Sequence, residues 1–342
     1  MRLSTRLRAT IPMQIRLMHL YFLSLLTGAL LMGAGPARAQ LALTLESKIP
    51  LGDIRGRLDH MAVDLHRQRL FVAELENDSV GVIDFERREI VHMISDVKRP
   101  QGLAYVPAAD TLFVANGGDG SLRMFEGAQY RALEPIHVGD DADNLRFNPE
   151  SNLIYVAYGE GALGIVDVAS RRKIRDLALT AHPESFQLER QTNRIYVNVP
   201  KEQAIVVMDQ ASGHRLANWQ TRNASNFPLA LNADAGHVLA IFRNPASLVA
   251  FAAASGTPLA KVETCGDADD MFVDPKRRRV YVSCGDGFLD VFDASPYKLI
   301  ERIPTIKGAR TSLLVPDIDR LFVAARETAE APAAVWVFRP GP

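Results

Sequence analysis

A short phrase recurs about every 42 residues along this chain: an aromatic residue, a valine, and a small or polar residue. The six clear copies are Phe71-Val72-Ala73, Phe113-Val114-Ala115, Tyr155-Val156-Ala157, Tyr196-Val197-Asn198, Tyr281-Val282-Ser283 and Phe322-Val323-Ala324. A weaker copy, Leu239-Ala240-Ile241, fills the one gap, and the intervals are 42, 42, 41, 43, 42 and 41 residues. A period in the forties with several short strands per unit is typical of a β-propeller, with one repeat per blade.

One repeat, residues 142–180, divides readily into four strands separated by turn residues such as Asn148-Pro149 and Gly159-Glu160-Gly161. The expected strands cover residues 144–147, 153–157, 163–168 and 173–179. An aspartate lies at or near the end of several third strands, where its carboxylate can accept a backbone N–H in a turn. These aspartates are Asp84, Asp167, Asp209 and Asp293. We therefore expect an all-β protein, a seven-bladed β-propeller with four antiparallel strands per blade.

The two ends of the repeat array predict how the ring closes. The seventh repeat ends at Trp336-Val337-Phe338 without a fourth strand, whereas residues 41–49 form a strand pattern that has no blade of its own. Because an unpaired sheet edge would leave a seam in the ring, we expect this N-terminal strand to pair into the last blade as its outer strand.

In its blade pattern the repeat resembles the YVTN-type β-propeller repeat of secreted bacterial and archaeal proteins. The nearest copies are Phe113-Val114-Ala115-Asn116 and Tyr196-Val197-Asn198-Val199, and the resemblance covers roughly residues 41–338. It implies the propeller fold. That family has no single activity, so the resemblance assigns no catalytic residue.

The first 39 residues lie outside the repeat and have the pattern of a secretory signal. A basic start is followed by an apolar run at 17–32 and by Ala37-Arg38-Ala39, a small-x-small cleavage pattern before Gln40. Translation from Met13 would leave a signal of more ordinary length. We expect residues 1–39 to be a signal peptide and 40–342 a single propeller domain, periplasmic or secreted, with no membrane span after cleavage.

The charge of the mature chain argues against nucleic acid as a partner. The chain has 39 basic and 40 acidic residues, and five of the arginines lie in the predicted signal, which leaves 34 basic residues. A net charge near −6 lacks the basic surface that phosphate binding requires. The expected partners are a small molecule or an extracytoplasmic protein, and the expected state is a monomer.

Cys265 and Cys284 are the only cysteines, and both fall in the sixth repeat. One precedes its first strand and the other ends its second strand, so antiparallel pairing brings them near each other. In an oxidising compartment the first expectation is a structural disulfide. Two free thiols and a redox or soft-metal pair are the alternatives.

Polar residues concentrate where each repeat enters its inner strand. Aligned on the recurring phrase, one position per blade gives Asp59, Gln101, Asp143, Glu184, Phe227, Asp269 and Arg310. The next position includes His60, Asn144 and Asp270. In a propeller these connections surround one end of the central channel, here called the mouth. The predicted ligand-binding mouth consists of Asp59, His60, Gln101, Asp143, Asn144, Glu184, Asp269, Asp270 and Arg310.

Two interpretations of the mouth remain open. Arg310 lies between blades that carry Asp269 and Asp59, which suggests a self-neutralising network of these three residues. In blades three and four, carboxylate and amide oxygens without a matching cation suit Ca²⁺, Mg²⁺ or Mn²⁺. The candidate metal ligands are Asp141, Asp143, Asn144 and Glu184. The alternative is a hydrated acidic mouth whose polar groups cap loop backbone.

The sequence supports two classes of function. The first is a propeller that binds a small ligand, divalent ion or partner without catalysis, because the connections, apart from the stretch at 327–333, are too short to form a lid over the mouth. The second is a divalent-metal-dependent hydrolase or lyase, like gluconolactonase-like or virginiamycin B lyase-like propellers. In that case His182 or His60 is the candidate general acid or base.

Overall fold

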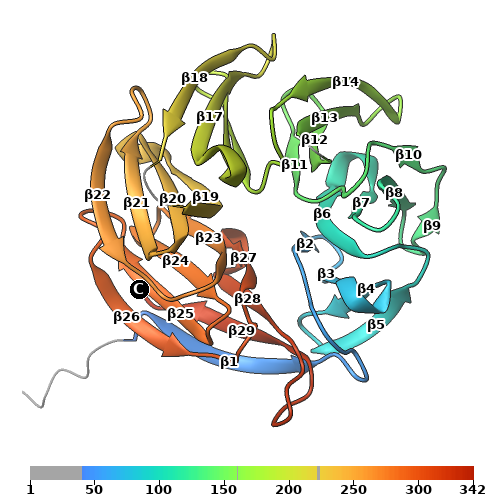
Figure 1. Cartoon of the computed structure of the whole chain (residues 1–342). Helices are drawn as coiled ribbons and strands as arrows, with labels where there is room; N and C mark the ends of the chain where they lie inside the picture. Colours follow the sequence, from blue (N-terminus) through green and yellow to red (C-terminus); the bar gives the residue numbers. More distant parts are fainter. Residues whose placement is uncertain (1–40, 160, 222–223) are drawn as a thin grey trace, which may run out of the picture. The chain divides into compact units, whose positions relative to one another are not determined.

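The computed structural model describes residues 41–342 except 160 and 222–223, so the predicted signal peptide lies outside the described residues. Within the described part, the strands form seven antiparallel sheets arranged as a ring of blades (Figure 1). The first strand of each sheet contacts the first strand of the next, and blade 7 contacts blade 1 in the same way. The predicted seven-bladed β-propeller is therefore confirmed.

The strands of each blade follow one another from the channel outward. Blade 1 contains β2 (Met61–Asp64), β3 (Arg69–Glu74), β4 (Ser79–Asp84) and β5 (Glu89–Ile94). Blade 2 contains β6 (Pro100–Val106), β7 (Thr111–Asn116), β8 (Ser121–Glu126), β9 (Arg131–Ala132) and β10 (Ile136–His137). Blade 3 contains β11 (Leu145–Asn148), β12 (Leu153–Tyr158), β13 (Ala162–Asp167) and β14 (Arg172–Ala178). Blade 4 contains β15 (Phe186–Glu189), β16 (Arg194–Val199), β17 (Ala204–Asp209) and β18 (Arg215–Gln220).

The remaining blades follow the same order, except that blade 7 takes its outer strand from the start of the described chain. Blade 5 contains β19 (Ala224–Asn232), β20 (His237–Asn244), β21 (Ala246–Ala252) and β22 (Pro258–Glu263). Blade 6 contains β23 (Ala268–Asp274), β24 (Arg279–Cys284), β25 (Phe288–Asp293) and β26 (Leu299–Pro304). Blade 7 contains β27 (Thr311–Val315), β28 (Arg320–Ala325), β29 (Ala334–Pro340) and β1 (Leu43–Pro50). Short 3₁₀ turns are η1 (Leu75–Asn77), η2 (Pro107–Ala109), η3 (Pro200–Glu202), η4 (Ala233–Ala235) and η5 (Pro316–Ile318).

The pairing of β1 with β29 confirms the predicted closure of the ring. The two strands run antiparallel from the Leu43–Pro340 pair to the Pro50–Ala334 pair. Blade 2 is the one departure from four continuous strands, because two short strands, β9 and β10, take the fourth position and both pair with β8. Pro135 lies between them and has no N–H to donate to a strand ladder.

The recurring phrase marks the centre of each second strand, where the propeller is most deeply buried. Phe71, Phe113, Tyr196 and Phe322 are almost completely excluded from solvent. Seven clusters of apolar side chains each combine residues from two neighbouring blades. Each fully buried side chain of this size contributes about 1.5–3 kcal/mol. The repeat therefore keeps its period because every blade must present the same packing face to its neighbour.

The aspartates that end the third strands close turns, as the sequence predicts. Asp84 accepts the backbone N–H of Arg87, and Asp167 accepts that of Ser170. Asp209 and Asp293 accept backbone N–H groups in the same way, from residues three and two positions further on. Among the described residues, there is no helix of the length and hydrophobicity that crossing a bilayer requires.

Candidate functional site

The backbone holds the mouth residues of different blades at equivalent positions. The N–H of Asp59 donates to the carbonyl of Ala73 in the adjacent second strand. The N–H groups of Asp143 and Glu184 make the corresponding hydrogen bonds to Ala157 and Asn198, at 2.8 and 3.0 Å. The repeat therefore places one side chain per blade at the channel end, and the side chain's chemistry differs from blade to blade.

On one side of the mouth, arginines neutralise the acidic residue of blade 6. Asp269 is 2.7 Å from Nη2 of Arg243 and 3.0 Å from Nε of Arg310. The Arg243 guanidinium also stacks on the Phe227 ring at 3.6 Å. Asp267 reaches both arginines, at 3.4 and 3.1 Å, but its side chain is 45% exposed. We call the set Arg243, Asp267, Asp269 and Arg310 the paired side.

The expected three-residue network is only partly correct. Arg310 pairs with Asp269 as expected, but among the described residues no ion pair joins Arg310 to Asp59. Asp59, which is completely buried, is instead 2.8 Å from Nη2 of Arg57. Arg57 comes two residues before Asp59 in the same loop, and this neighbouring arginine, rather than Arg310, is the cation that pairs with Asp59. Arg57 also lies 3.9 Å from Asp269, which links blade 1 to the paired side.

His60 acts as a further cation of the mouth. Its Nδ1 lies 3.4 Å from Asp270, and its Nε2 lies 3.7 Å from Asp59. Burial alone lowers the pKa of His60, but these two carboxylates outweigh it and raise the pKa to about 10. Because a ring that stays protonated at neutral pH cannot accept a proton, His60 does not suit the role of general base.

Asp143, His182 and Glu184 form the opposite side of the mouth. One potential ligand atom from each lies within 4.8 Å of the other two. Neither carboxylate accepts a hydrogen bond or forms an ion pair with a described residue. Burial raises the pKa of Asp143 well above its usual range, and the nearby Asp59 carboxylate adds to that rise. Burial also raises the pKa of Glu184, which the proximity of His182 offsets in part. We call these three residues the acidic side.

His182 is oriented by its own backbone contact. Its Nδ1 is 2.7 Å from the carbonyl oxygen of Gly159, in the hairpin between β12 and β13. Since a carbonyl can only accept, Nδ1 carries the hydrogen and Nε2 retains its lone pair. Histidines that bind metal ions use this kind of support, in which the second ring nitrogen donates to a fixed oxygen.

The other candidate ligands lie beside this cluster rather than in it. Asp141 is largely exposed and accepts a hydrogen bond from Nε2 of Gln101 at 3.3 Å. Asn144 is buried, and its Oδ1 lies 3.4 Å from Nη1 of Arg146. The structure thus groups Asp143 and Glu184 with His182, the candidate acid or base, and places Asp141 at the edge of this group, with its Oδ2 4.0 Å from Nδ1 of His182.

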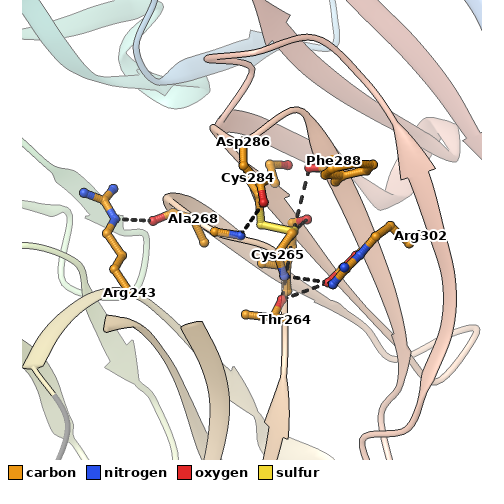
Figure 2. The surroundings of a disulfide bond; sticks show 12 residues. Arg243, Thr264, Cys265, Ala268, Cys284, Asp286, Phe288 and Arg302 are labelled. Atoms are coloured by element: carbon orange, nitrogen blue, oxygen red, sulfur yellow. Dashed lines mark hydrogen bonds and ion pairs between the residues drawn. A yellow bond between two sulfur atoms is a disulfide. The ribbon is translucent and has the colours of Figure 1, made fainter. Parts of the chain in front are cut away.

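Cys265 and Cys284 are joined by a disulfide at the base of the paired side (Figure 2). The backbone N–H of Cys265 donates to Asp290, which Arg302 also contacts. Three residues after Cys265, the carbonyl of Ala268 accepts a hydrogen bond from Nε of Arg243. The disulfide removes both sulfur atoms as thiolate ligands, and it braces the loop that carries Asp267 and Asp269.

Two functional arginines were missed by the sequence analysis. Arg243 ends the second strand of blade 5, four residues after the weak copy of the phrase, where four of the other repeats have Gly or Pro. Arg146 lies on the inner strand β11. The alignment of mouth residues considered only the entry to each inner strand. Aligning the ends of the second strands shows two charged positions, Arg243 in blade 5 and Arg326 in blade 7.

Comparisons with known proteins show the fold and nothing finer. No family profile matches the chain, and no curated protein matches it significantly. Among solved structures, a chain of Kuenenia stuttgartiensis hydrazine synthase is similar, with a TM-score of 0.72 and 17% sequence identity. The match covers 84% of this chain and 96% of that chain. At this identity the similarity carries no activity across, and the chain is identified by its architecture alone, as a seven-bladed β-propeller.

Proposed function

We propose that this propeller binds a divalent cation on the acidic side of its mouth and, through that ion, a small anionic or oxygen-bearing ligand. The observation that carries the proposal is the cluster of Asp143, His182 and Glu184, with potential ligand atoms within 4.8 Å of one another. Two half-buried carboxylates with raised pKa values and no ion-pair partner among the described residues would be stabilised by a bound ion, which replaces their protons.

The donor set favours one of the three candidate ions. Ca²⁺ and Mg²⁺ prefer oxygen ligands alone, whereas an imidazole together with carboxylates suits Mn²⁺. Asp143, Glu184 and Nε2 of His182 would hold the ion, and it would supply a positive charge for a ligand oxygen at the mouth. Asp140, Asp141, Tyr158 and Lys201 line an adjoining cavity of about 530 Å³ in which such a ligand would lie.

The setting proposed for this activity is extracytoplasmic. The support is the sequence pattern of residues 1–39 and the resemblance to YVTN-type repeats of secreted proteins. In this proposal residues 40–342 are the mature domain, a periplasmic or secreted monomer that acts by binding. A metal-dependent hydrolase or lyase would use the same ion, but the protonated His60 leaves that chemistry without one of its two candidate bases.

Titration of Mn²⁺ into the chelator-treated mature domain tests this proposal. We expect saturable binding at one ion per chain, weakened more than about tenfold in Glu184→Gln, the loss seen when even a supporting contact of a metal site is removed. Glu150→Gln, an exposed residue in a turn at the other end of blade 3, is the matched control and should bind as the wild type. Equal Mn²⁺ affinity in both variants would refute the site. Metal-dependent turnover of a lactone would favour the hydrolase instead.

A further inference from the structure

A half-buried arginine in the channel has no carboxylate within ion-pair distance among the described residues. Arg146 lies on β11, inside the ring, and faces a cavity of about 370 Å³ at the centre of the propeller. Its Nη1 donates to the carbonyl of Leu145 at 2.7 Å and approaches Asn144 at 3.4 Å. Among the described residues, Nε and Nη2 have no acceptor, and no carboxylate forms an ion pair with this side chain. The guanidinium also lies over the Phe186 ring at 5.5 Å. A partly desolvated charge without an ion pair is costly, which favours binding of a ligand of opposite charge.

The other ionic groups around this cavity neutralise each other. His60 lies 3.4 Å from Asp270, and Asp270 also accepts the backbone N–H of Ser312 at 2.8 Å. Gln187, on the inner strand of blade 4, donates to the carbonyl of Leu229. The Arg146 guanidinium is therefore the one charge on the cavity wall, among the residues described, that no neighbouring charge contacts. Burial lowers the pKa of Arg146, and the more distant charges of Asp270 and Asp143 offset that decrease only in part.

The rest of the wall is mostly apolar and comes from the inner strands of several blades. It includes Met61, Leu103, Leu231, Met271, Phe272 and Leu313. The volume of about 370 Å³ lies within the range of small-molecule pockets, which combine apolar walls with a few fixed polar groups. One arginine fork in an apolar cavity matches a singly charged, planar carboxylate; a phosphate would require more donors.

We propose that the central channel binds a small organic monocarboxylate, with its carboxylate on the free Nε–Nη2 edge of Arg146 and its apolar body against the inner strands. This site is distinct from the cation site at the mouth, because it has the opposite charge and needs no metal ion. His60 and Asn144 border both the channel cavity and the narrow space of about 20 Å³ that leads to the mouth. The two sites therefore lie one behind the other along the channel.

Titration of hexanoate into the mature domain, with excess EDTA to remove any ion at the mouth, tests the proposal. We expect saturable binding to the wild type that weakens roughly 10- to 100-fold in Arg146→Met, the effect of losing hydrogen bonds to a charged group. Arg172→Met, which removes an exposed arginine from the outer strand β14, is the matched control and should bind hexanoate normally. Without hexanoate, Arg146→Met should melt at the same temperature as the wild type or higher, because an unpaired, half-buried charge has been removed.

Two further probes on the wild type keep the test decisive even if Arg146→Met folds poorly. Hexan-1-ol has the same apolar body without the charge and should bind at least tenfold more weakly than hexanoate. Inorganic phosphate has charge without an apolar body and should also bind more weakly. Hexanoate binding that persists in Arg146→Met, or equal binding of hexanoate and hexan-1-ol, would overturn the proposal, as would tighter binding of phosphate.

Discussion

The two sides of the mouth carry the same kind of side chain, but only one side supplies it with ion-pair partners. On the paired side, Asp269 has two arginine partners within 3.0 Å and a third cation, Arg57, at 3.9 Å. On the acidic side, Asp143 and Glu184 are half-buried and have no arginine within ion-pair distance among the described residues, and their pKa values are raised. Burial raises the pKa of Asp269 too, but Arg310 and Arg243 oppose that rise.

This difference supports the proposal that the paired side has a structural role and the acidic side a binding role. Where charged side chains neutralise one another within the protein, they hold neighbouring blades together. Such pairs leave no unpaired charge for a ligand to contact. Carboxylates that are crowded and unpaired destabilise the protein until a cation or a proton neutralises them. The segment Asp141-Ala142-Asp143 recurs as Asp267-Ala268-Asp269, and only the second copy has arginine partners, from blades 5 and 7.

The largest effect should come from breaking the paired side. Asp269→Asn leaves two largely desolvated guanidinium groups with only the half-exposed Asp267 within ion-pair distance of both. We expect a loss of about 3–5 kcal/mol in the free energy of unfolding, the usual result of removing one partner of a buried ion pair. Urea unfolding measures it. The control Asp267→Asn, at a half-exposed position, should cost less than about 1 kcal/mol. Equal losses in the two variants would remove the distinction between them.

Glu74 extends the comparison to a carboxyl group raised by burial alone. It ends β3, is completely buried, and binds only Ser79, and burial raises its pKa to about 7. Because the folded-state pKa exceeds the unfolded one, the stabilisation is complete below about pH 4.3 and is lost as the pH rises through about 7. At 1.36 kcal/mol per pKa unit, that loss is about 3 kcal/mol.

Glu74→Gln should therefore flatten the stability profile. As the pH rises from about 4 to about 9, the free energy of unfolding of the variant should increase by about 3 kcal/mol relative to that of the wild type. Thermal unfolding across that range measures it. Mn²⁺ should not change the gain, because Glu74 lies outside the acidic side. An unchanged pH profile would show that Glu74 titrates in the ordinary range.

The smallest effect is expected on the acidic side itself. Asp143→Asn replaces a carboxyl group that is easily protonated, so the stability near neutral pH should change by only about 1 kcal/mol. The variant should become the more stable of the two as the pH rises. The raised pKa of Asp143 makes the wild type lose stability with increasing pH, and the variant lacks that group. Added Mn²⁺ should reverse the order by stabilising the wild type alone, as thermal shifts would show. If Asp143→Asn instead lost much of its stability in the absence of metal, Asp143 would have a structural role like that of Asp269.

The fold could be predicted from the sequence because every blade packs against its neighbours in the same way. The anchor phrases, the Asp-closed turns and the missing fourth strand of blade 7 are local signals with a fixed period. The split outer strand of blade 2 could also be inferred from Pro135. Strand order and closure then follow from the requirement that every sheet edge be paired.

The candidate site was predictable in position but not in its contacts. The register placed Asp59, Asp143, Glu184 and Asp269 at one end of the channel, because backbone pairing repeats from blade to blade. The register of the repeats could not show that Arg57 pairs with Asp59 or that Arg243 pairs with Asp269. Long arginine side chains cross blade boundaries, and their direction depends on packing that no periodicity records. Arg146 escaped notice for the same reason.

The pairing of β1 with β29 also sets the order in which the molecule can be completed. Six blades are built from contiguous stretches of chain and can form as soon as their own strands exist. The seventh has to bring together strands from opposite ends of the described chain, a contact of very high sequence separation. Until β29 is made, β1 has no partner and its buried residues Leu43 and Ile49 remain uncovered. The strand that closes the ring, β1, thus stays unpaired longer than the other strands during synthesis and folding. In that interval it can pair with another chain.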